Sequence, residues 1–261
     1  MRIALWLCGL AVTGSGCAGS RLSGRDLARI SRPALIGRIE EQAGPKAEVF
    51  RLDPSYKEQL RRLDAKEGDR RLQLKLTRGM SRWEVAERLR AATLSLLPKE
   101  EPWTQAIDPV AVARVFQSYL VEEVPVNEPD YKLLRPMGAD SVLEFVIQEY
   151  GMKSKEGKAA AYVRGYARLF KLKGGTLWSR AFDADGFKQK AGNLDPFRVA
   201  KEPMLYKDAM NGLVDAVAAQ LARDLNPPDR ANASPAKPQT SGQEETTPAA
   251  ETPTPDEPDP L

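Results

Sequence analysis

The sequence predicts an α+β domain over residues 33–226, with a mainly antiparallel sheet and helices packed on one face. Two observations indicate this class. First, three β-rich segments follow one another after Ser141 with short polar turns between them, as in an antiparallel meander. Second, helical signals flank these strands: a capped helix begins at Ser81, and an apolar helix covers about 203–225.

The helical signals before the meander come from capping residues. Ser81 and Glu84 have the spacing of a capping box, and Pro98 ends the helix that they begin. Asp108 and Pro109 begin a second helix as its N-cap and first helical residue. The apolar residues expected to face the core recur at helical spacing: Val85, Leu89, Ala92 and Leu96 in the first helix, and Val112, Phe116, Tyr119 and Leu120 in the second.

One further strand is predicted between Pro33 and Leu76, where the pattern is otherwise mixed. Residues 70–77 alternate, and Leu72 and Leu74 would lie on the same side as Leu76. Alternation over this length is typical of a half-buried strand.

The N-terminal segment has the features of a secretory signal. Arg2 is followed by an apolar run of about ten residues, whereas a bilayer span needs roughly 20. Gly14, Ser15 and Gly16 then precede Cys17, which resembles the lipobox of bacterial lipoproteins, although that family prefers leucine at the position of Gly14. The alternative is an ordinary signal peptide with an incidental cysteine.

The lipobox resemblance implies a location as well as an anchor. It implies a signal peptide over 1–16, acylation of Cys17 and a lipidated tether over 17–32. Several acyl chains would hold the protein on a membrane permanently. Ala18 stands where aspartate directs such lipoproteins to the inner membrane, so the resemblance implies the periplasmic face of the outer membrane.

Composition excludes several classes of function. The chain contains no histidine, and its two cysteines, Cys8 and Cys17, both lie in the N-terminal segment. Ser-His-Asp and Cys-His catalysis and the usual zinc sites are therefore excluded, and we expect no cofactor or metal. Basic residues are spread along 18–226 without a dense stripe, so we expect no nucleic-acid partner. Residues 227–261 are rich in proline and poor in large apolar side chains, which predicts a disordered tail.

The segments "MGADSVLEFVIQEYG" and "GYARLFKLKGGTLWSRAFD", followed by a helix, resemble a recurring element of periplasmic lipoproteins. These are the lipoproteins related to the curli-secretion component CsgG and the penicillin-binding-protein activator LpoB. Lys171 replaces their usual aspartate, and their N-terminal strand is not recognisable here. The matching residues are Gly138, Ala139, Asp140, Val142, Leu143, Ala167, Arg168, Leu169, Gly175, Leu177 and Trp178.

This resemblance implies a membrane-anchored, non-enzymatic adaptor or accessory subunit in envelope assembly, secretion or cell-wall synthesis. An envelope protein complex is the expected partner, and self-association stays open. The competing hypothesis is a carboxylate-dependent enzyme that modifies the cell wall. Glu144 and Glu149 are expected on opposite faces of one strand, because their separation is odd. Glu122 and Glu123 are expected at a solvated helix end.

A ladder of cations and aromatic rings is the candidate partner-binding surface. A three-residue loop ending at Gly174 would set the register of the last hairpin and place Leu169 opposite Leu177. The alternative is that a helix covers this side, with the arginine stems packed beneath it. The predicted pairs are Arg168 with Trp178, Tyr166 with Arg180, and Arg164 with Phe182.

Overall fold

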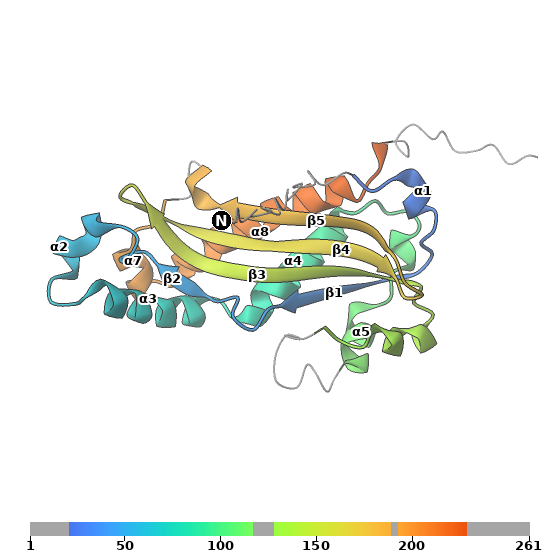
Figure 1. The fold of residues 1–261 in the computed structure, drawn as a ribbon, viewed down its shortest axis with the longest axis horizontal. Helices are drawn as coiled ribbons and strands as arrows, with labels where there is room; N and C mark the ends of the chain where they lie inside the picture. The colour runs from blue at the N-terminus through green and yellow to red at the C-terminus, as the bar shows by residue number, and fades with distance from the viewer. Residues whose placement is uncertain (1–20, 117–127, 189–192, 229–261) are drawn as a thin grey trace, which may run out of the picture.

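A computed structural model describes residues 21–116, 128–188 and 193–228, and it confirms the α+β class (Figure 1). The sheet has five strands in the order β1-β3-β4-β5, with β2 also paired to β3. β3, β4 and β5 form the predicted antiparallel meander, whereas β1 and β2 run parallel to β3. The strands are β1 Pro33–Ile39, β2 Lys46–Glu48, β3 Ser141–Lys155, β4 Lys158–Lys171 and β5 Thr176–Asp185.

Two long helices cover one face of the sheet, here called the helix face. α4 (Arg82–Leu96) and α8 (Met204–Asp224) pack against each other and against β1 and β4, and both cross behind the sheet in Figure 1. α3 (Ala65–Gly79) packs beside β2. The shorter helices are α1 Gly24–Leu27, α2 Lys57–Leu60, α5 Pro109–Val115 and α7 Pro196–Lys201, and the 3-10 turns are η1 Pro54–Tyr56, η2 Trp103–Gln105, η3 Tyr131–Met137 and η4 Gly186–Lys188.

The opposite face, here called the Glu144 face, carries a second and smaller core. α5 and η3 cover this face at one end of the sheet and pack on β1 and β3. Its buried residues include Ile36, Phe116, Leu134 and Val142. The main helical layer thus lies on one face as predicted, with a partial cover on the other.

The caps of α4 and α5 are confirmed. The Ser81 hydroxyl accepts from the Glu84 amide at 3.2 Å, and the Glu84 carboxylate accepts from the Ser81 amide at 2.7 Å. The Asp108 carboxylate accepts from the Val110 amide. The expected stripe of α4 holds at Val85 and Leu89 but not at Leu96, which is 53% exposed. The buried side continues through Ala86, Arg90 and Thr93, because α4 contacts both β1 and α8.

The strand predicted for 70–77 is wrong, since these residues lie inside α3. Leu72 and Leu76 are buried one helical turn apart, whereas Leu74 is 52% exposed. Leucines at i and i+4 fit both the strand and the helix period. The intervening Arg, Gln and Lys are good helix formers, and Asp64 supplies an N-cap that accepts from the Glu67 amide.

Strand β1 was not predicted. Its sequence "PALIGRI" is buried at nearly every position, because α4 covers one of its faces and α5 the other. A strand covered on both faces shows no alternation of apolar and polar residues. The sequence pattern therefore gives no sign of this strand, although it lies within the sheet beside β3.

The predicted register of the last hairpin is wrong. Leu169 lies opposite Trp178, Ala167 opposite Arg180 and Gly165 opposite Phe182, and a bulge shifts the pairing beyond Leu169. The observed register packs the Phe182 ring over Gly165, where an added Cβ would lie 2.8 Å from the ring. Burial of the aromatic rings therefore sets this register.

Both ends of the described domain meet at one end of the molecule. The Leu22 amide donates to the Asp224 carbonyl at 2.8 Å, and Leu22, Leu27 and Ile30 belong to the main core. The fold thus extends beyond the expected start at residue 33. In the described part of the chain, no helix is long and apolar enough to span a membrane. Outside the described residues lie the predicted signal peptide, Cys17, Tyr119, Leu120, Glu122, Glu123 and 229–261.

Candidate functional site

The Glu144 face contains a buried carboxylate surrounded by donors. Glu144 on β3 is 0% exposed, and Arg38 Nε donates to it from β1 at 2.9 Å. Arg168 on β4 and the Tyr131 hydroxyl of η3 also donate to it. Arg38 further donates to the Tyr166 hydroxyl at 3.3 Å. Both Glu144 oxygens are therefore engaged, and the group joins three strands to η3.

The surroundings of Glu144 shift the pKa values of its donors. Burial raises the pKa of Tyr131, and the nearby Glu144 charge raises it further, so this hydroxyl stays protonated. Burial alone would lower the pKa of Arg168, but its hydrogen bonds and charge interactions with Glu144 and Glu128 together outweigh burial and raise the pKa. Arg168 also pairs with Glu128 at 2.9 Å. The cluster is thus a buried ion network in which the Tyr131 hydroxyl and the Arg168 guanidinium both stay protonated near neutral pH.

Glu149 lies on the same face as Glu144, so the prediction of opposite faces is wrong. A bulge between Ile147 and Glu149 adds one residue to β3 and turns the strand, which places Glu149 opposite Arg164. The Lys46 ammonium donates to Glu149 at 2.8 Å and lowers the pKa of that carboxyl. A general acid needs a raised pKa, so this environment does not suit Glu149 to that role.

The six residues of the predicted ladder do not form one surface. Arg164, Tyr166 and Arg168 lie on the Glu144 face, because the hairpin register differs from the prediction. The other three lie on the helix face, where Trp178 and Phe182 are 4% and 5% exposed. Arg180 Nε pairs there with Asp224 at 3.2 Å. Arg180 therefore fits the alternative stated above, in which an arginine stem packs beneath a helix.

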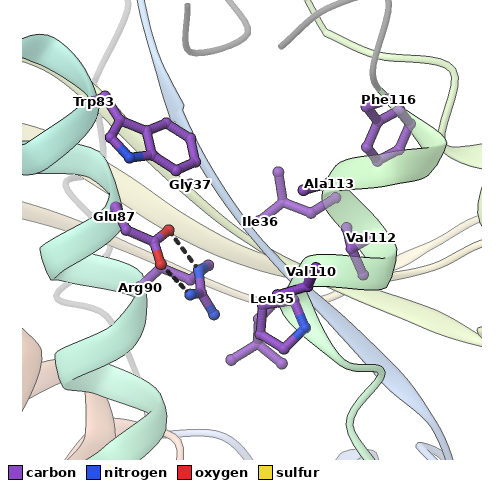
Figure 2. A pocket seen from close by; sticks show the side chains of 11 residues that line it. Leu35, Ile36, Gly37, Trp83, Glu87, Arg90, Val110, Val112, Ala113 and Phe116 are labelled. Carbon is purple, nitrogen blue, oxygen red and sulfur yellow. Dashed lines mark hydrogen bonds and ion pairs between the residues drawn. The ribbon is translucent and has the colours of Figure 1, made fainter.

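A groove at the outer edge of β1 was not predicted (Figure 2). Its cavity of about 210 Å³ lies between α4 and α5, with β1 as the floor. Gly37 lets α4 approach, because a Cβ at this position would lie 2.9 Å from the Ala86 carbonyl oxygen. The lining residues are Leu35, Ile36 and Gly37 from β1, Trp83, Glu87 and Arg90 from α4, and Pro109, Val110, Val112, Ala113 and Phe116 from α5 and its ends.

The groove is mainly apolar. Trp83 and Val110, on opposite walls, are 45% and 57% exposed, so the apolar lining continues to the rim of the groove. Glu87 and Arg90 form an ion pair on the α4 wall, with Arg90 Nε donating at 2.9 Å. Glu87 is the one carboxylate among the lining residues, and Arg90 engages both its oxygens. The groove therefore suits an apolar group rather than acid–base chemistry.

The groove combines segments that are far apart in the sequence. The available sequence signals are the apolar run broken by Gly37 and the tryptophan at position 83, and neither alone indicates a groove. In the described part of the chain, no cluster of three or more acidic side chains is arranged to hold a metal ion.

Comparison with known proteins finds no matching family and no matching curated protein. Among solved structures, the chain is similar to the PelC dodecamer from Paraburkholderia phytofirmans, with 10% identity and a TM-score of 0.34 over 80% of this chain and 95% of that one. It is also similar to lipoprotein GNA1162 from Neisseria meningitidis, with 18% identity and a TM-score of 0.36 over 74% of this chain and 99% of that one.

Proposed function

We propose that the protein is a lipid-anchored periplasmic adaptor of the cell envelope that lacks catalytic activity and docks a partner protein in the β1 groove. The observation that carries this proposal is that the carboxylates considered for catalysis are paired with cations, whereas the groove exposes apolar side chains. Glu144 and Glu149 are bound by cations, as is Glu87 in the groove, whereas large apolar side chains are exposed at the groove rim. Exposed apolar patches of this kind are typical of protein interaction sites.

The anchor in this proposal comes from the N-terminal sequence. Cys17 follows a short apolar run and small residues, as in the lipobox of bacterial lipoproteins. The first described residues lie beside the end of α8, so a lipid on Cys17 would hold this end of the domain near a membrane. The resemblance to CsgG-related and LpoB-related lipoproteins supports a role in secretion or cell-wall synthesis. The outer membrane is the proposed location, because Ala18 follows Cys17.

Site-specific photo-crosslinking in intact cells tests the docking role. A photoreactive phenylalanine analogue replaces Trp83 in the groove or, as a control, Leu74, which is exposed on α3. We expect one discrete adduct from position 83, identified by mass spectrometry as an envelope protein and absent at position 74. Deletion of the gene for that protein should abolish the adduct. Equal labelling from both positions would contradict the docking role.

A separate assay tests the absence of catalysis. The purified chain is incubated with isolated peptidoglycan, and the released fragments are measured by chromatography. We expect no release above the level of buffer alone. Release that is lost on substitution Glu87→Gln would establish a carboxylate enzyme and overturn the proposed function.

A further inference from the structure

The outer edge of β1 presents backbone groups to the groove. The Glu40 amide donates to the Ile147 carbonyl at 2.9 Å, so even-numbered residues of β1 direct their backbone groups towards β3. Odd-numbered residues direct theirs away from the sheet, and the Pro33 carbonyl accordingly accepts from Ile107 on the outer side. Within the described ranges, nothing pairs with the outward N–H and C=O groups of Gly37 or with the Leu35 N–H. Such groups are a template for another strand.

The walls of the groove match the side chains of an added strand. Strands pair at roughly 4.8 Å, and their side chains point alternately to the two faces of the sheet. A strand paired with β1 would therefore direct one set of side chains towards Trp83 on α4. It would direct the other set towards Val110, Val112 and Phe116, on the side of α5. Trp83 on one wall and the three apolar residues on the other favour apolar side chains in such a strand.

Arg90 supplies an independent indication of a ligand. The residue is 8% exposed, and its Nη1 has no hydrogen-bond partner. Nε and Nη2 both bind Glu87, and the third nitrogen points away from that carboxylate in Figure 2. A buried donor without an acceptor is unfavourable, and an acceptor in the groove would remove this penalty. Because Glu87 already balances the charge of Arg90, a neutral carbonyl oxygen is a better acceptor than a second carboxylate.

We propose that the groove binds an extended segment of a partner protein, uncharged and apolar where it contacts the walls, which adds a strand to β1. The outward groups of Leu35 and Gly37 pair with its backbone, and Arg90 Nη1 donates to one of its carbonyl oxygens. This mode of recognition takes affinity from main-chain hydrogen bonds and specificity from pockets for alternate side chains. The inference rests on the proposed docking function and names the kind of partner.

A defined peptide tests the inference on the full chain in detergent. The probe is a ten-residue peptide of alternating valine and threonine, acetylated and amidated at its ends. Its control is the same peptide N-methylated at every residue, which cannot donate to a strand. We expect saturable NMR shift changes at the Leu35 and Gly37 amides with the probe and none with the control.

A pair of variants tests the walls. Val110→Asp places a charge at the exposed rim of the groove and should weaken binding by about tenfold or more, equivalent to about 1.4 kcal/mol. Leu133→Asp, at a comparably exposed residue of η3, should leave binding unchanged. An equal loss in both variants would overturn the inference.

Three further results would also overturn it: no binding at millimolar peptide, equal binding of both peptides, or a Gly37 amide already protected from exchange without peptide. The last result would mean that the chain covers its own edge. A Trp83 adduct in cells without peptide binding would leave the docking function intact. Peptide binding without an adduct would instead contradict the docking function.

Discussion

At the scale of single residues, a carboxylate can be buried only where donors replace the water that it loses. Glu144 meets this condition through Arg38, Arg168 and Tyr131. Glu144→Gln would leave the two guanidinium groups without their shared counter-charge, so we expect the free energy of unfolding to fall by about 3–5 kcal/mol. Urea unfolding measures this loss.

Glu149→Gln is the matched control for Glu144→Gln. Its carboxylate is on the same face and also pairs with two cations, but its side chain is 35% exposed. Solvent screens its ion pairs, so we expect a loss of less than about 1 kcal/mol. Equal losses for the two variants would show that burial does not strengthen the Glu144 network.

Asp140, one of the residues that carry the lipoprotein resemblance, has a structural role at the start of β1. Its carboxylate accepts from the Ser31 and Arg32 amides at 3.0 Å and fixes the entry to β1. Burial acts to raise the pKa of Asp140, but these amides and the side chains of Ser141 and Lys171 together outweigh burial, and its pKa is lowered. A lowered pKa contributes stability above the unfolded value, near pH 4, and this contribution is lost as pH falls through the folded pKa.

Asp140→Asn should therefore destabilise the domain by about 1–2 kcal/mol at pH 7. The difference from the wild type should shrink as the pH falls below about 4. Thermal unfolding at pH 7 and pH 3 measures both effects, with the exposed Asp183→Asn as the control. If the difference in stability is as large at pH 3 as at pH 7, the effect of Asp140→Asn comes from altered hydrogen-bond geometry and not from the lost charge.

At the scale of elements, β3, β4 and β5 pack closely around Gly165. A Cβ at this position would lie 2.0 Å from the Val146 carbonyl oxygen and 2.8 Å from the Phe182 ring. Gly165→Ala would therefore force the strands apart or displace the ring, and we expect a loss of about 3 kcal/mol. In the control Gly212→Ala, on the exposed side of α8, nothing lies within 4 Å of the new Cβ.

The control should gain about 0.5–1 kcal/mol, because alanine favours a helix over glycine. Chemical denaturation of both variants gives the two free energies. A loss in the control, or none at Gly165, would contradict the packing described here.

The elements predicted from the sequence are those with local signals. The capping box at Ser81 and the polar breaks of the meander specify their elements within a few residues. Strand β1 depends on tertiary packing instead, because it is buried on both faces. Helix α3 has local signals of its own, but its leucines fit two periods. The hairpin register depends on how Phe182 packs over Gly165, which no local pattern shows.

The candidate site was less predictable than the fold. The groove combines 35–37, 83–90 and 109–116, which meet only when α4 and α5 pack beside β1. The bulge in β3 also brings Glu149 to the face of Glu144, although their odd separation in the sequence predicts opposite faces. A pattern within one strand indicates its faces only while the strand stays regular, and a single inserted residue reverses them.

At the scale of the whole molecule, the position of the first described residues relates the fold to the proposed anchor. Leu22 is held at the end of α8. The chain between Cys17 and Leu22 can span at most roughly 18 Å. A lipid on Cys17 would therefore keep this end of the domain close to the membrane.

Two cysteine variants test the anchor. Cys17→Ala removes the proposed acylation site, so the protein should either remain an unprocessed precursor or leave the membrane fraction. Cys8→Ala changes the other cysteine, inside the apolar run, and should be processed and anchored as the wild type is. Metabolic labelling with a palmitate analogue and fractionation of cells measure acylation and location together. If the Cys17→Ala protein is still labelled, processed and membrane-bound, the anchor is contradicted, because acylation then does not depend on Cys17.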